Sequence, residues 1–149
     1  MKKTKLLISL LMVLALAVPM YCVQTYASSQ NPTSEERMAG TAKYVAILVT
    51  SNCLTKGSLG KLTCEGETEV QLGYIAGIKI ELQQQNGSSW TTIKTWEGSS
   101  TAPARRIYLA NDWYVVKGTY QLKLTHTSYN SSGQLLETVY KYSKTVTVN

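Results

Sequence analysis

The sequence is poor in the residue types that active sites and metal sites use. Its 149 residues include one histidine, His126, one aspartate, Asp112, and three cysteines. A Ser-His-Asp triad would need both His126 and Asp112, and no serine lies in the glycine pattern of a nucleophile elbow. The cysteines lie far from the histidine along the chain, which is not the spacing of a zinc ligand set. We therefore expect no enzymatic activity, no metal and no cofactor.

Phenylalanine is absent, and charged residues make up only 16% of the chain. Any aromatic core must therefore be built from the 10 tyrosines and 3 tryptophans. The hydrophobic fraction of 44% is too high for a wholly disordered chain, and the length fits one globular domain. The composition predicts a single folded domain whose aromatic residues are shared between packing and binding.

The first 27 residues have the pattern of a secretory signal peptide. Three early lysines precede an apolar run from Leu6 to Val18, and small residues stand at −3 and −1 before a cut after Ala27. The run of about 13 residues is shorter than the roughly 20 that span a bilayer. Lipid attachment at Cys22 is disfavoured because Tyr21 precedes it. We expect a secreted, extracellular protein without a membrane span.

Export would change the charge balance. Without the signal peptide, 12 basic and 9 acidic side chains remain, a net charge of +3 instead of +6. This ordinary surface charge argues against nucleic acid as a partner. The adjacent Arg105 and Arg106 would point to opposite faces of a strand, so they do not indicate an anion site. Residues 28–41 are polar and are expected to form a flexible leader.

Residues 42–149 have the pattern of an antiparallel β-sandwich. β-Branched and aromatic residues dominate, and turn signals recur at short spacing. Tyr120, two residues after Gly118, resembles the corner tyrosine of immunoglobulin-like and fibronectin type III domains. Alternation places His126 on the face of Leu122 and Leu124, which indicates a structural histidine. The expected strands, about seven with some short pieces, are Tyr44–Ser51, Lys61–Val70, Gly77–Gln84, Trp90–Trp96, Arg106–Ala110, Trp113–Val116, Thr119–Tyr129 and Leu135–Val148, the last of them broken near Ser143.

Four short motifs occur in a recognisable order between Ala42 and Val148. They are W-x-x-I-x-x-W, G-x-Y, S-G-x-x-x-E and Y-S, formed by Trp90, Ile93 and Trp96, by Gly118 and Tyr120, by Ser132, Gly133 and Glu137, and by Tyr142 and Ser143. In this order they resemble a family of small secreted β-sandwich proteins of Gram-positive bacteria that has no assigned activity. The resemblance implies an exported sandwich and carries over no catalytic residue.

Cys53 and Cys64 remain after removal of the signal peptide and flank a turn-rich segment. An even number of cysteines in an exported chain favours a disulfide. If a four-residue loop pairs Lys56 with Lys61, Cys53 lies directly opposite Cys64, within bridging distance. Two free, buried thiols are the alternative.

The tryptophans are the candidate ligand-binding residues, and their placement depends on one turn. Asn86-Gly87 is a hairpin signal. A two-residue turn would place Trp90 and Trp96 away from the core, as an exposed binding platform, and a bulged three-residue turn would place both in the core. Trp113 is a third candidate, if exposed.

Glu65, Glu67 and Glu69 alternate and should project from one face of a strand. Neighbours on that face are about 7 Å apart, too far to share one calcium ion, so we expect a solvated row of charges.

The sequence therefore predicts a secreted, non-enzymatic binding or structural module, with a cell-surface or cell-wall carbohydrate or a protein as partner. An antimicrobial or toxin-like protein acting at membranes is the alternative, although no amphipathic helix supports it. A small cell-wall hydrolase would require paired carboxylates across a groove. The oligomeric state stays open.

Overall fold

The structure, a computed structural model, describes residues 46–149, and the predicted signal peptide (1–27) and the predicted flexible leader (28–41) lie outside them. The described residues form eight strands and no helix, which confirms the predicted all-β class. None of these residues belongs to a helix that is long and apolar enough to cross a membrane. The strands are β1 (Ile47–Lys56), β2 (Lys61–Val70), β3 (Ile75–Asn86), β4 (Ser89–Ser99), β5 (Arg106–Tyr114), β6 (Gly118–Tyr129), β7 (Leu135–Tyr142) and β8 (Val146–Val148).

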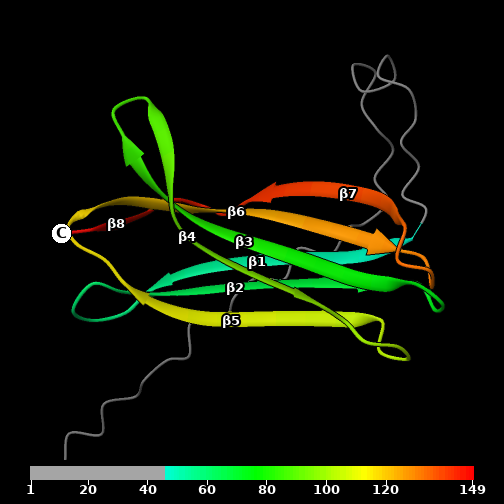
Figure 1. Cartoon of the computed structure of the whole chain (residues 1–149). Coiled ribbons are helices and arrows are strands. Elements are labelled where there is room, and N and C mark those ends of the chain that lie inside the picture. The colour runs from blue at the N-terminus through cyan, green and yellow to red at the C-terminus, as the bar shows by residue number, and fades with distance from the viewer. Residues whose placement is uncertain (1–45) are drawn as a thin grey trace, which may run out of the picture.

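The strands form two antiparallel sheets that pack face to face as a β-sandwich (Figure 1). The smaller sheet has the order β1-β2-β5, and the larger has the order β4-β3-β6-β7, with β8 paired to β6. After β4 the chain leaves the larger sheet, so that β5 pairs with β2 along its length. This crossover makes β4 and β5 edge strands on the same side of the molecule.

The core between the sheets follows the period-two alternation of the strands. Its fully buried side chains come from the middle strands of both sheets, namely Leu62, Cys64, Ile80, Leu82, Leu122 and Leu124. Gly66 on β2 lets the sheets approach closely, because a Cβ there would lie 2.8 Å from the Ile78 Cδ1 atom of β3. The alternating pattern thus predicted correctly which face of β3 and β6 is buried.

The hydroxyl of Tyr120 donates a hydrogen bond of 2.8 Å to the carbonyl oxygen of Val116, four residues upstream. The ring is 1% exposed and packs in the main core cluster. This is the geometry of a tyrosine corner at the start of a late strand, as the sequence predicted.

Several strand boundaries differ from the prediction by one to three residues, and the largest differences are in β1 and β5. The pieces expected on either side of Asn111-Asp112 form one continuous strand, β5, because β2 provides a hydrogen-bonding partner throughout. β1 extends to Lys56 for the same reason. The predicted break near Ser143 is confirmed, since β7 ends at Tyr142 and β8 begins at Val146. At the break, the Ser143 hydroxyl accepts a hydrogen bond of 2.8 Å from the Leu122 amide of β6.

Candidate functional site

The two tryptophans of β4 lie on opposite faces of the larger sheet, which neither expected turn provides. The turn is formed by Gly87 and Ser88, and Trp90 pairs with Gln85 on the outer face. A register shift between Leu82 and Gln83 then changes the pairing, so that Trp96 pairs with Ile80 on the core side. The shift leaves one extra residue in β4, and such a bulge reverses the side on which later residues point. In Figure 1 this hairpin bends away from the sandwich.

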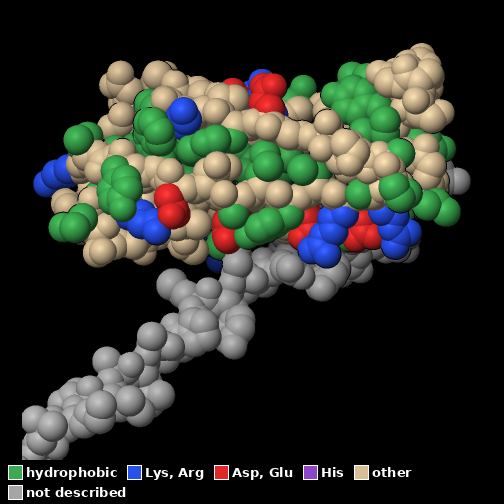
Figure 2. Space-filling model, turned by 60° about the horizontal axis from the view of Figure 1, so that its bottom comes forward, with side chains coloured by type: hydrophobic (Ala, Val, Ile, Leu, Met, Phe, Trp, Pro, Cys, Tyr) green, Lys and Arg blue, Asp and Glu red, His purple; other side chains and the backbone are tan. Residues whose placement is uncertain are grey.

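Trp96 and Trp113 meet where the edge strands β4 and β5 face each other. Their ring centroids are 6.3 Å apart with an interplanar angle of 78°, and Trp96 packs against the core. The ammonium of Lys94 lies 4.6 Å from the Trp113 ring centroid, and Trp113 remains 37% exposed beside it. Figure 2 shows hydrophobic side chains along this side of the molecule. Lys94 therefore competes with a sugar for the face of Trp113 that it covers, and Trp96 contributes to the core.

The predicted disulfide between Cys53 and Cys64 is wrong. Cys64 is a free, buried cysteine on the core face of β2, and it pairs with Leu54. The β1–β2 turn is one residue longer than expected, because Leu59 and Gly60 both have positive φ, of 55° and 76°. The one-residue slip pairs Cys53 with Glu65, on the opposite face from Cys64. Burial raises the pKa of the Cys64 thiol to about 12.

The three glutamates of β2 share the outer face of the smaller sheet, as predicted, but they do not form the expected solvated row, because each is paired and Glu67 is buried. Arg106 contacts Glu67, and Arg105 lies 3.3 Å from Glu69. The Tyr108 hydroxyl donates a hydrogen bond of 2.7 Å to Glu65. Figure 2 shows basic and acidic side chains next to one another along one edge. Within residues 46–149, this face therefore presents neither a free acidic cluster nor a free basic patch.

The outer face of the larger sheet is different, because a hydrogen-bonded network of polar side chains crosses it. The Gln121 amide donates to Gln83 at 3.0 Å, and Gln83 donates to the Thr92 hydroxyl at 3.3 Å. These residues connect β6, β3 and β4. Side chains fixed in this way present donors and acceptors in set orientations, which a polar ligand can match.

A groove of about 600 Å³ opens on this face, and its floor is formed at Gly77. A Cβ at Gly77 would lie 3.0 Å from the Tyr129 Cε2 atom, so the Tyr129 ring leans from β6 over the missing side chain. Thr127 pairs with Gly77, and Thr125 and Glu97 also line the groove. One aromatic ring, two threonine hydroxyls and one carboxylate thus line a single concavity.

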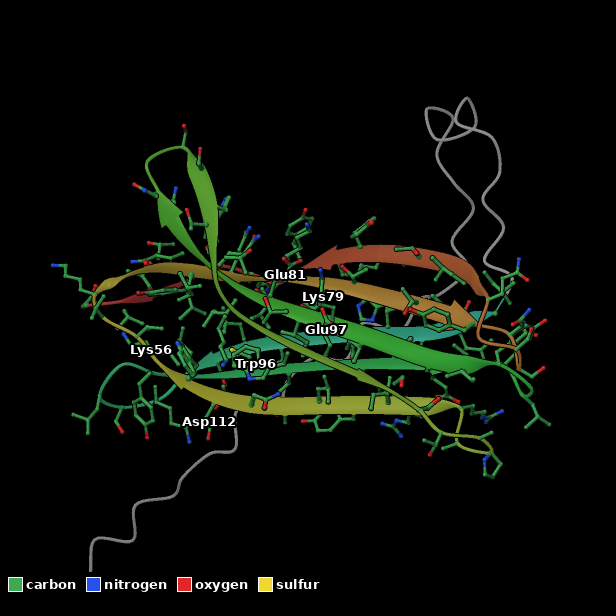
Figure 3. All side chains as sticks on the ribbon, viewed as in Figure 1. Lys56, Lys79, Glu81, Trp96, Glu97 and Asp112 are labelled. Carbon is green, nitrogen blue, oxygen red and sulfur yellow. The ribbon has the colours of Figure 1, made fainter. Side chains whose placement is uncertain are left out.

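Beside the groove, two lysines share one glutamate, while a second glutamate has no lysine of its own in the described part of the chain. The ammonium groups of Lys79 and Lys123 lie 4.0 and 3.7 Å from the same carboxylate oxygen of Glu81. Glu97 pairs with Lys79 in the strand register, yet within residues 46–149 no ion pair of 4.0 Å or less includes it. Figure 3 shows Lys79, Glu81 and Glu97 close together on β3 and β4, with Trp96 on the side toward the smaller sheet.

Two more tyrosines continue this face onto the edge strand β7. Tyr140 and Tyr142 are 60% and 57% exposed and pair with Thr125 and Lys123 of β6. Alternate residues on a strand are about 7 Å apart, so the two rings form a short row along the strand direction. The Lys123 ammonium lies 5.8 Å from the Tyr140 ring centroid.

Sequence reasoning pointed to the three tryptophans and missed the tyrosines. Of the candidates, only Trp90 lies on the polar outer face, and Trp96 and Trp113 form a separate pair. Alternation in β6 places Tyr129 on the outer face of the strand, on the other side from the core residues, and this pattern was a signal for a ring outside the core. The Gly77 concavity had no such signal, because it depends on β6 pairing next to β3.

His126 lies in the core, as predicted from alternation, and is fully buried. Among the described residues, no group of three or more His, Cys, Asp or Glu side chains is placed to hold a metal ion. No protein-family model matches the chain, and no curated protein is significantly similar to it.

Proposed function

We propose that this chain is an exported, non-enzymatic binding module that holds a cell-surface polysaccharide on the outer face of its larger sheet. The observation that carries the proposal is the groove at Gly77, which is lined by the Tyr129 ring and by the polar side chains of Thr125, Thr127 and Glu97.

The chemistry of the groove suits a carbohydrate. An amphipathic tyrosine ring stacks on the C–H face of a sugar, while hydroxyl and carboxylate oxygens bond to the sugar hydroxyls. The volume of about 600 Å³ lies within the range of small-ligand sites. A protein partner would favour a flat apolar patch, and this face is crossed instead by glutamine and threonine side chains.

The arrangement favours binding over hydrolysis. Glycoside hydrolysis normally uses two carboxylates on opposite sides of the scissile bond. Within residues 46–149, Glu97 is the one carboxylate that lines the groove. Glu81 is the next acidic residue on this face, and it is engaged by Lys79 and Lys123. A single carboxylate is sufficient for recognition but not for this mechanism.

The test is affinity electrophoresis of the purified protein in gels containing soluble cell-wall polysaccharides. We expect at least one polysaccharide to retard the protein, and Tyr129→Ala to weaken that binding at least about tenfold, as for a central aromatic contact. Tyr114→Ala is the matched control, because Tyr114 is 67% exposed on the smaller sheet and should not affect binding. Trp113→Ala should also bind like the parent protein.

Because Tyr129 covers Gly77, its removal can loosen the sheet as well as the site. Thermal unfolding of Tyr129→Ala is therefore recorded alongside, and Thr125→Val provides a second variant that leaves the ring in place. The proposal is wrong if no polysaccharide binds, or if Trp113→Ala abolishes binding while both groove variants retain it.

A further inference from the structure

Resting on the proposed function, we infer that the groove selects a polysaccharide whose hexosamine units carry a free amino group. The feature that points to this ligand is the Glu97 carboxylate, which lines the groove and lacks a basic partner within 4.0 Å in the described part of the chain.

The nearest cation to consider is Lys79, which lines the same groove and pairs with Glu97 in the register of β3 and β4. Its ammonium contacts Glu81 instead, at 4.0 Å, and Lys123 approaches that carboxylate from β6 at 3.7 Å. Glu81 is held further by the Thr92 hydroxyl at 3.5 Å. The positive charge beside the groove is thus directed toward Glu81, and Glu97 is left to a ligand.

An ammonium group on the ligand would satisfy the unpaired carboxylate of the groove. It would form a charge-assisted hydrogen bond with the Glu97 carboxylate. An N-acetyl group at the same position has no charge and gains no such interaction. The groove is therefore complementary in charge to an amino sugar.

The selection would be local, because the protein as a whole repels cations. Residues 46–149 carry 10 basic and 7 acidic side chains, a net charge of +3. Long-range attraction therefore cannot produce a preference for a cationic oligosaccharide. A measured preference of this sign would have to arise at a specific carboxylate.

The experiment compares two oligosaccharides of equal length, β-1,4-linked glucosamine and its fully N-acetylated counterpart. Titration calorimetry at about pH 6 gives the affinity of each for the purified protein. We expect the amino form to bind roughly three- to fivefold more tightly, the upper range for one exposed ion pair. The preference should fall at 0.5 M salt.

Glu97→Gln should remove the preference and bring the two affinities within about twofold. Glu65→Gln is the matched control, because it makes the same change in net charge on the outer face of the other sheet and should keep the preference. A preference that survives in Glu97→Gln would overturn the inference, since it would show that another group selects the charge.

Failure of the inference and failure of the proposed function give different results. Equal binding of both oligosaccharides, weakened by Tyr129→Ala, overturns the amino-sugar selection and leaves the polysaccharide module intact. If a different polysaccharide binds and neither glucosamine oligomer does, the amino-sugar selection is likewise overturned and the polysaccharide module is retained. Absence of binding to every saccharide tested overturns both.

Discussion

The Oγ1 atom of Thr68 and the Nδ1 atom of His126 lie 2.8 Å apart and join the two sheets through the middle of the core. Thr68 gives its single hydroxyl proton to the carbonyl oxygen of Gly77 at 3.1 Å. With the Thr68 hydroxyl donating to Gly77, the matching tautomer of the imidazole has its proton on Nδ1 and donates it to Thr68. The other nitrogen, Nε2, is buried without a partner. The neutral ring fits this place, and a protonated ring would not.

The first prediction follows from this pair and concerns acid stability. Burial, with a smaller contribution from the charge of Lys141, lowers the pKa of His126 from 6.5 to about 4. The unfolded chain binds a proton below pH 6.5 and the folded protein does not, so stability is lost as the pH falls from 6.5 toward 4. The loss should reach about 3 kcal/mol. Urea unfolding at several pH values measures this loss of stability. His126→Gln should make the free energy of unfolding less dependent on pH between 6.5 and 4. An unchanged dependence in this variant would exclude His126 as the cause.

The second prediction concerns the thiol of Cys64. Because it is buried and its pKa is raised to about 12, it should not react with iodoacetamide in the folded protein at pH 8. In urea it should react fully. Peptide mapping by mass spectrometry after alkylation, without a reducing agent, distinguishes the two states. A peptide that links Cys64 to Cys53 would contradict the structure.

The third prediction concerns the close approach of the sheets at Gly66. Gly66→Ala should reduce the free energy of unfolding by about 1–3 kcal/mol, because the new methyl group would meet the side chains of Ile78 and Leu124. Gly57→Ala is the control, since its Cβ would lie 3.4 Å or more from its neighbours. Urea unfolding of both variants checks the difference; equal stability would mean that the sheets are not in contact at this point.

The fourth prediction concerns the tyrosine corner. Tyr120→Phe removes the hydrogen bond to the Val116 carbonyl and should cost about 1 kcal/mol of stability. Tyr142→Phe, at a ring that is 57% exposed, should leave the stability unchanged. Thermal unfolding of the pair is sufficient, and similar melting temperatures for the two variants would show that the corner is not stabilising.

The fifth prediction concerns the row formed by Tyr140 and Tyr142 and rests on the proposed function. If a polysaccharide chain lies along the strands from the groove to this row, affinity should increase with oligosaccharide length. Tyr142→Ala should then weaken the binding of long oligosaccharides severalfold and leave short ones unaffected, whereas Tyr129→Ala should weaken both. Calorimetry over a length series tests this. Equal effects of Tyr142→Ala at all lengths would place the ligand elsewhere.

Local pattern was sufficient for the strands and for their buried faces, but not for the candidate site. Alternation in β3 and β6 correctly separated Ile80 and Leu124 from Lys79 and Lys123. The tryptophans were misjudged because the outcome depended on a bulge in β4, and the groove at Gly77 was missed because it needs residues from three strands. Registers between strands cannot be read from one strand, since each depends on the partner's hydrogen bonds.

The sequence by itself determined an all-β domain, the core residues of its middle strands and the corner tyrosine, because these follow from a side-chain period of two and from local turn residues. Only the tertiary structure decided that β5 pairs with β2 in the smaller sheet and not with the preceding strand β4. It also decided that Cys64 faces the core away from Cys53, and that Tyr129 covers Gly77. The physical reason is that a shift of one residue in strand pairing reverses the face of every later side chain. Such shifts are decided by turn length and by contacts between distant segments.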